Sequence, residues 1–269
     1  MRILKSRGLE IAYLDQGKGP TVIVGHCSSA SHKEWLPLIE TLTPSWRVIA
    51  PDFIGYGRSQ AWPEDRVFTG QADVDALLEL AKKAKRPLHL VGHSYGAALS
   101  LQAARELGPK VKSLVLVEPV AFNLLRVEGR PEWAEIERLG RQVLTAVANG
   151  EDRAAAAAFM RYWLGRLRWW MSPERFKAAI TATIPKVALE FMIALDADTR
   201  LADYASISAP TLLVAGGQTR APARAVTEMI GATLPNARVS ILKGAGHMSP
   251  FTHPAEVNRL VLEHLAAHR

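Results

Sequence analysis

The sequence contains a single cysteine, Cys27, among its 269 residues. No disulfide can form within the chain, and this composition is consistent with a reducing compartment. Residues 1–10 are mixed and polar and lack the apolar core of a secretory signal. No later apolar run reaches the roughly 18 residues that a membrane span needs. We therefore expect a cytoplasmic protein with no membrane partner.

A dense run of basic residues is also missing, although the formal net charge is +7. Lysines and arginines are scattered, with acidic residues among them, which is more typical of a soluble surface than of a nucleic-acid-binding stripe. The 48% of hydrophobic residues is ordinary for a globular protein and is enough for a sizeable core without metals. We expect a small-molecule substrate, no nucleic-acid partner, and a monomer or homodimer.

Short apolar runs with β-strand character alternate with helix-period segments. The expected strands are 9–14, 21–24, 46–50, 88–91, 111–117, 211–214 and 238–242, and the expected helices are 34–42, 71–84, 97–107, 223–234 and 255–267. Because most of these strands are apolar throughout, the pattern predicts an α/β fold with a mostly parallel, doubly wound sheet covered on both faces.

This alternation stops between residues 121 and 205, where no convincing strand is present. The segment instead contains helix-rich stretches, including an alanine run at 154–158 and a stretch at 172–180. We therefore predict a core formed by residues 1–120 and 206–269, interrupted by an inserted helical block.

The clearest chemical signal is Gly92-His93-Ser94-Tyr95-Gly96, a G-x-S-x-G pattern between an expected strand and an expected helix. A serine hydroxyl is a poor nucleophile unless it is exposed and a base can take its proton. A sharp strand-to-helix turn provides the exposure, and the two glycines leave room for the neighbouring elements. We predict Ser94 as the nucleophile and the Tyr95 N–H, at the helix start, as a donor to an oxyanion.

With three further segments, this motif makes the chain resemble the α/β-hydrolase fold family over nearly its whole length. The segments are residues 25–29, 51–59 and 244–247, each following an expected strand. The resemblance implies a serine hydrolase without a metal or organic cofactor. It also implies that 121–205 is a helical cap over the active site, inserted after the sixth core strand. A serine at 94 argues against the aspartate-dependent dehalogenases and epoxide hydrolases of this family.

His247 is the predicted base. It lies in a glycine-flanked loop just after the last expected strand, where the family places its catalytic histidine. Such a loop can turn toward the carboxyl edge of the sheet, where Ser94 is also expected.

The acid of the triad is less obvious, because no aspartate occurs after Asp203. Thr219 stands where the family usually has its aspartate. Some members place the acid after the preceding core strand instead, which here gives Glu118, and we predict Glu118 as the acid. The alternatives are Asp196, Asp198, Asp203, and a dyad in which Thr219 only hydrogen-bonds His247.

The second oxyanion donor that the resemblance implies is the N–H of Ser28. Cys27, beside it, replaces the family's usual glycine. A nucleophilic cysteine here would lack the strand–turn–helix setting of Ser94, so a small buried residue at the pocket is the favoured interpretation.

Four of the seven tryptophans fall in the inserted block, at 133, 163, 169 and 170. We expect Trp163 and Trp169 to line a moderately hydrophobic pocket. The alternative is that these aromatics only pack the block against the core while nearby arginines extend to water.

The sequence therefore predicts hydrolysis of a small to medium carboxylic ester or related acyl compound through an acyl-enzyme on Ser94. Carbon–carbon bond hydrolysis and perhydrolysis are alternative chemistries on the same residues. A non-catalytic or weakly active small-molecule-binding protein is the alternative class, and the missing late aspartate is its main support.

Overall fold

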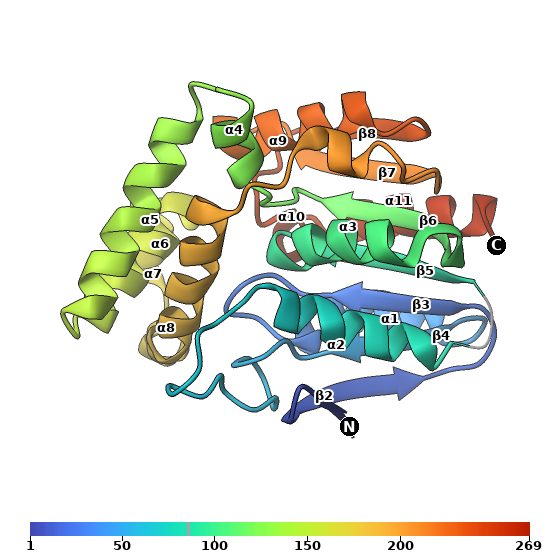
Figure 1. Cartoon of the computed structure of the whole chain (residues 1–269), viewed down its shortest axis with the longest axis horizontal. Coiled ribbons are helices and arrows are strands. Elements are labelled where there is room, and N and C mark those ends of the chain that lie inside the picture. The colour runs from blue at the N-terminus through green and yellow to red at the C-terminus, as the bar shows by residue number, and fades with distance from the viewer. Residues whose placement is uncertain (85–86) are drawn as a thin grey trace.

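An eight-stranded sheet forms the centre of the computed structural model, which describes residues 1–84 and 87–269 (Figure 1). Its spatial order is β1 (Arg2–Ser6), β2 (Leu9–Gln16), β4 (Arg47–Pro51), β3 (Thr21–Gly25), β5 (Leu88–His93), β6 (Val111–Val117), β7 (Thr211–Gly216) and β8 (Ala237–Leu242). Only β2 runs antiparallel to its neighbours; from β4 to β8 all pairings are parallel. The predicted α/β class with a mostly parallel sheet is confirmed.

The central strands are buried along their whole length, as their apolar sequences predict. Every residue of β3, β5 and β7 is buried, which requires layers on both faces of the sheet. The edge strand β1 was not expected from the polar segment 1–10. Its burial alternates, with Leu4 and Ser6 turned inward, and pairing with β2 rather than its own hydrophobicity makes it a strand.

Helices cover both faces of the sheet. One face carries α2 (Gln71–Lys82), α3 (Tyr95–Leu107) and α9 (Ala221–Thr233), whereas α1 (Leu36–Leu42) and α11 (Pro254–Ala267) lie on the other. The helix expected at 34–42 begins as a 3₁₀ turn, η1 (His32–Trp35), and becomes α-helical at Leu36.

The segment between β6 and β7 contains no strand and is fully described. It holds α4 (Asn123–Val127), α5 (Trp133–Ala148), α6 (Asp152–Leu164), α7 (Arg166–Met171) and α8 (Glu174–Asp196), which we call the inserted helices. Figure 1 shows them together beyond the carboxyl ends of the parallel strands. The helical stretch expected at 172–180 is part of the 23-residue α8, which continues through Pro185. The short helix η3 (Leu201–Tyr204) follows and packs on α3 and α9.

Helix α8 is, by length and composition alone, apolar enough to cross a membrane, with a mean hydropathy of 1.6 over its best 18-residue window. The expectation that no segment would reach this threshold therefore does not hold for α8. Buried core helices pass the same test, and α8 carries Lys186 and Glu190, which are both buried and paired. We regard the segment as weak evidence for a membrane span.

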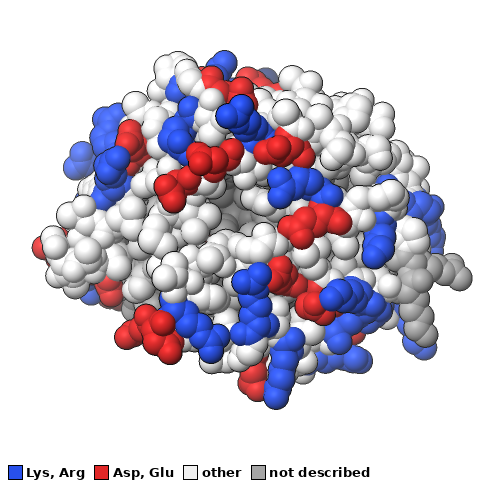
Figure 2. All heavy atoms as spheres, in the orientation of Figure 1, with Lys and Arg blue, Asp and Glu red and all other residues white. Residues whose placement is uncertain are grey.

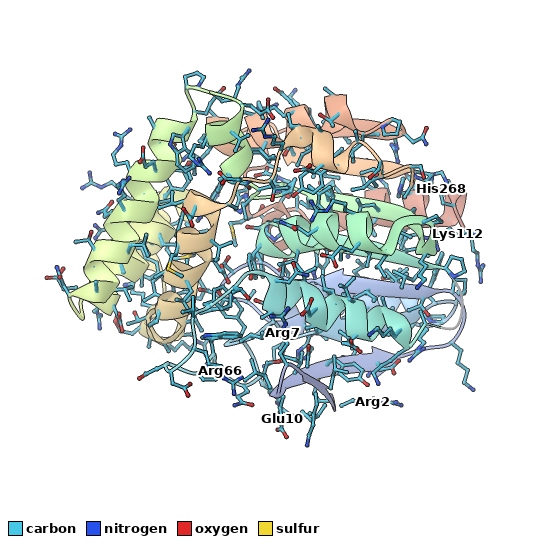
Figure 3. The ribbon with its side chains drawn as sticks, viewed as in Figure 1. Arg2, Arg7, Glu10, Arg66, Lys112 and His268 are labelled. Atoms are coloured by element: carbon cyan, nitrogen blue, oxygen red, sulfur yellow. The ribbon has the colours of Figure 1, made fainter. Side chains whose placement is uncertain are left out.

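Charges of both signs are mixed over the surface. Figure 2 shows lysines and arginines interspersed with acidic residues across one face. In Figure 3, Arg2 and Arg7 lie near the sheet edge formed by β1 and β2, whereas Lys112 lies at the end of the molecule beside His268. The basic surplus is therefore spread out on these views.

The turn between β5 and α3 is packed so closely that two positions must be glycine. A Cβ added to Gly96 would lie 2.5 Å from the carbonyl carbon of Gly25, and one added to Gly92 would lie 2.6 Å from the nitrogen of Ala97. Both clashes involve backbone atoms, which cannot rotate away. The glycines of the motif thus allow β3, β5 and α3 to meet at Ser94.

We expect Gly96→Ala to lower the free energy of unfolding by about 1–3 kcal/mol, as overpacking does. A decrease in stability would be informative, because alanine otherwise stabilises a helix relative to glycine by about 1 kcal/mol. Denaturant titration measures the change. The matched control is Gly140→Ala in α5, where an added Cβ meets side chains and no backbone: Phe191 at 3.0 Å and Leu195 at 3.2 Å. A smaller loss in Gly96→Ala than in Gly140→Ala would contradict this packing argument.

Candidate active site

Ser94 occupies the sharp turn between β5 and α3, with φ 54° and ψ −115°. Such a conformation in a residue with a side chain costs on the order of 1–3 kcal/mol. The turn is held because the Ser94 N–H donates to the Val117 carbonyl at 2.9 Å, and the N–H groups of Ala97 and Ala98 donate to the Ser94 carbonyl. The hydroxyl is thereby fixed at the carboxyl edge of the sheet.

Positive φ angles at residues other than glycine concentrate at this edge. Four such residues occur in the described chain, and three of them, Ser29, Ser94 and Glu118, lie in the loops after β3, β5 and β6. Backbone strain of this kind clusters at functional sites. The angles mark this edge independently of the sequence motif.

A continuous hydrogen-bond chain joins three of the residues singled out by the sequence. The Nε2 atom of His247 lies 3.0 Å from Ser94 Oγ, and its Nδ1 atom lies 2.7 Å from Glu118 Oε2. The three side chains come from loops after β8, β5 and β6. The structure thus brings Ser94, His247 and Glu118 together from positions far apart in the sequence.

Glu118 is completely buried and its carboxylate is fully occupied. Its Oε1 atom accepts from the Gly216 N–H at 2.7 Å, and its Oε2 atom accepts from Thr219 Oγ1 at 2.6 Å as well as from His247. Thr219, at the position of the family's usual aspartate, therefore contacts the glutamate rather than His247.

The other candidate acids are engaged elsewhere. Asp198 pairs with Arg126 at 2.8 Å, and Asp203 accepts from the Arg200 N–H at 2.8 Å. Asp196 contacts Arg126 through its backbone carbonyl, at 3.3 Å from Nη2. Among the described residues, Glu118 is the carboxylate that reaches His247.

Burial and neighbouring groups set the protonation states of His247 and Glu118. Burial lowers the pKa of His247, and the Glu118 carboxylate only partly opposes this, so the pKa stays below its ordinary value of 6.5. Burial would raise the pKa of Glu118, but the hydrogen bonds from His247, Thr219 and Gly216 outweigh it and hold this pKa below normal. Near neutral pH, a neutral imidazole therefore faces Ser94 while a carboxylate faces Nδ1.

A second histidine–carboxylate pair, His93 with Glu34, lies next to His247 and was not predicted from the sequence. His93 Nε2 lies 3.0 Å from the His247 carbonyl, and His93 Nδ1 lies 2.6 Å from Glu34 Oε1. Burial lowers the pKa of His93, but the Glu34 carboxylate outweighs it and raises the pKa above normal. With an acceptor at each ring nitrogen, His93 is suited to the imidazolium form and fixes the backbone of His247. His93 was visible in the motif, but no local pattern connects it with Glu34.

Cys27 belongs to this buried group rather than to an open site. Its N–H donates to Glu34 Oε2 at 2.8 Å. Burial and the nearby Glu34 raise the pKa of its thiol well above normal, which keeps it protonated and unreactive. Cys27, Glu34 and His93 place possible metal-ligand atoms within 4.8 Å of one another. Glu34 and His93 already hydrogen-bond each other there.

Two backbone N–H groups beside Ser94 are available to an anion. Those of Ser28 and Tyr95 donate to no other group within residues 1–84 and 87–269. Tyr95 is the first residue of α3, where N–H groups have no partner inside the helix. Ser28, Ser94 and Tyr95 all line one cavity.

This cavity has a volume of about 340 Å³ and lies between the core and the inserted helices. Its walls are largely apolar, and Phe122, Phe159 and Phe191 contribute to them. Trp163 lines it as predicted from the sequence, whereas Cys27 and Trp169 are not among its lining residues, which corrects the expectation for both. Trp169 is buried among the inserted helices against Phe176.

Trp163 also lines a second hollow, of about 640 Å³, whose walls include His247. Its indole stacks on the His247 imidazole, with ring centroids 3.7 Å apart and an interplanar angle of 25°. Trp163 thus covers one face of the histidine ring while lining both spaces.

Comparison with known proteins supports the fold. The family model described as alpha/beta hydrolase fold matches residues 20–254. A bovine (Bos taurus) monoacylglycerol lipase ABHD6 is 22% identical over 93% of this chain and 77% of its own length. A putative carbamate hydrolase RutD of Stutzerimonas stutzeri is 23% identical over 92% of both chains. A solved thermophilic esterase from Thermogutta terrifontis superimposes with a TM-score of 0.80 at 24% identity, covering both chains completely.

We expect the pKa of His247 to lie below 6.5 and to fall further in Glu118→Gln, because the carboxylate that favours the imidazolium is lost. Titration of the imidazole resonances by NMR measures both values, and the signal is assigned by its absence in His247→Ala. Glu228→Gln, on the exposed part of α9, is the matched control and should leave the pKa unchanged. An increase in Glu118→Gln would contradict the assigned interaction.

Proposed function

Because this chain belongs to the alpha/beta hydrolase fold family, we propose that it is a serine hydrolase acting on a small to medium, moderately hydrophobic carboxylic ester or related acyl compound. The observation that carries the proposal is the hydrogen-bond chain Ser94–His247–Glu118, which ends beside two unpartnered N–H groups in one cavity.

In the first half of the proposed reaction, His247 Nε2 takes the proton of Ser94 Oγ while this oxygen bonds to the substrate carbonyl carbon. The carbonyl oxygen becomes an oxyanion that the N–H groups of Ser28 and Tyr95 stabilise. The imidazolium then gives its proton to the leaving oxygen, the bond to the leaving group breaks, and an acyl-enzyme on Ser94 remains.

In the second half, water replaces the leaving group. His247 takes a proton from this water as it adds to the acyl carbon, and returns the proton to Ser94 Oγ as the carboxylic acid is released. Glu118 keeps the proton of the neutral imidazole on Nδ1, which leaves Nε2 free to act as the base, and it stabilises the imidazolium formed in each half.

The walls of the cavity support the substrate class. The inserted helices supply Phe159, Trp163 and Phe191 and would act as the cap, so that the acyl or alcohol part contacts aromatic and aliphatic surface. The named activities of the relatives differ: a monoacylglycerol lipase, a carbamate hydrolase and an esterase. Membership of the family therefore supports the reaction type, and the shape and polarity of these walls would determine which substrate binds.

A fluorophosphonate probe should form one adduct, on Ser94, located by mass spectrometry. Hydrolysis of p-nitrophenyl esters should fall by at least about 10³-fold in Ser94→Ala and in His247→Ala, since each removes part of a cooperating unit. Ser172→Ala and His268→Ala are the matched controls outside the site. No adduct on folded protein would contradict catalysis and favour the small-molecule-binding alternative, whereas an adduct on Cys27 would overturn the choice of nucleophile.

Trp163→Ala should lower kcat about 2- to 10-fold through loss of its stacking on His247, since aromatic pairs contribute about 0.5–1.5 kcal/mol. Trp163→Phe keeps an aromatic face and should lose less. Steady-state ester hydrolysis gives both values, and Trp170→Ala is the control because that side chain is 74% exposed. Equal losses in the alanine and phenylalanine variants would argue against a role for the stacked ring.

A further inference from the structure

A buried ion cluster connects the inserted helices to the core, and the triad does not account for it, although one of its members, Glu190, also lines the cavity. Lys186 of α8 is buried, with Nζ 3.1 Å from Asp73 Oδ2 of α2 and 2.9 Å from Glu190 Oε1 of α8. Figure 1 shows α8 on the core-facing side of the inserted helices. We call Asp73, Lys186 and Glu190 the ion cluster.

The ammonium group is enclosed by aromatic rings as well as carboxylates. Its nitrogen lies 4.6 Å from the ring centre of Phe68, 4.7 Å from that of Tyr95 and 5.2 Å from that of Tyr56. Burial alone would lower the pKa of Lys186, but Asp73 and Glu190 outweigh it and raise the pKa. The lysine is therefore charged, and the cluster carries one positive and two negative groups.

The carboxylates of this cluster hold the side chains of the two proposed oxyanion donors. Glu190 Oε2 accepts from Ser28 Oγ at 2.6 Å, and Asp73 Oδ2 accepts from Tyr95 OH at 2.7 Å. The remaining oxygens accept from Tyr56 OH at 2.6 Å and from the Ile54 N–H at 2.9 Å. Each carboxylate oxygen therefore has a donor, and two of the donors belong to Ser28 and Tyr95.

Helix α8 reaches the same loop a second time. Thr183 Oγ1 lies 2.9 Å from the hydroxyl of Ser29, whose backbone has a φ of 57°. Two neighbouring serines of the loop after β3, one of them strained, thus rest on α8 through separate hydrogen bonds.

Stability alone is a poor explanation for burying three charges. Their removal from water is costly, and replacing such a cluster by apolar residues is often neutral or stabilising. Buried charges do fix geometry, because each partner loses its interaction if the other moves. The groups fixed here are the ones whose N–H direction matters for an oxyanion.

We propose that Lys186 and Glu190 are positioning residues that hold Ser28 and Tyr95 in the geometry of the oxyanion hole, so that the hole is complete only while α8 is seated on the core. This inference rests on the proposed function. It makes the docking of the inserted helices a condition for stabilising the transition state, in addition to shaping the cavity.

The test is a double-mutant cycle of Glu190→Gln and Ser28→Ala, with kcat and KM measured for each variant. Ser28→Ala removes the hydroxyl and keeps the backbone N–H. We expect each single variant to lower kcat about 10- to 100-fold with little change in KM, because misplaced donors weaken transition-state binding more than substrate binding. In the double variant, Glu190→Gln should add less than about 2-fold, since both substitutions break one contact.

The matched control is Glu174→Gln, the same change on the same helix at a side chain that is 60% exposed, and it should keep wild-type kcat. If Glu190→Gln does not fold, Ser28→Ala and Tyr95→Phe test the inference, because each removes only a hydroxyl that contacts the cluster. Both should then lower kcat at unchanged KM, and by more than any decrease in the folded fraction explains.

Several outcomes would overturn the inference. Losses that multiply in the double variant would mean that Glu190 acts independently of Ser28. If the loss of kcat is explained entirely by a smaller fraction of folded protein, the cluster only stabilises the fold. Wild-type kcat in Ser28→Ala and Tyr95→Phe would remove the connection to the oxyanion hole. These results require an active wild-type protein, whereas a wild-type protein with neither hydrolysis nor a Ser94 adduct would contradict the proposed function itself.

Discussion

The arrangement of the candidate site depends on the hydrogen bonds that the Glu118 carboxylate accepts. Its two oxygens bind the N–H of Gly216 at the end of β7, the hydroxyl of Thr219 in the following loop, and the imidazole of His247 beyond β8. Glu118 itself follows β6, so one carboxylate joins three successive loops of the sheet edge. Because it is buried with every contact directed at the charged form, loss of this group would leave several donors without partners.

Much of this arrangement follows from local sequence. Apolar strands alternate with amphipathic helices over most of the core, and a carboxyl edge where such strands end collects the residues that follow them. This rule places Ser94, Glu118 and His247 near one another, although it does not fix their distances. The strand β1 was missed because its formation depends on pairing with β2, and the length of α8 was underestimated because it continues through Pro185.

The long-range polar pairs could not be predicted from sequence. Glu34 and His93 are 59 positions apart, Asp73 and Lys186 are 113 apart, and Ser28 and Glu190 are 162 apart. Each residue alone resembles an ordinary charged or polar residue of a helix or loop. These residues become buried partners only when separate layers of the fold pack together. The periodicity of apolar residues in the sequence does not predict that packing. The same reason explains why Trp163, but not Trp169, lines the cavity.

The chain leaves the sheet after β6 and returns at β7, and these two strands are direct neighbours. The ends of the inserted helices lie close together at the carboxyl edge, because Asn123 Nδ2 donates to the Thr199 carbonyl at 2.9 Å. A segment of different length could therefore replace them in evolution without moving a strand, since loop closure depends only weakly on length. Such a replacement would nevertheless remove Lys186 and Glu190 and leave Asp73 buried without its cation. A lineage that exchanges this insertion must then also change position 73, and the two regions should vary together among descendants of this chain.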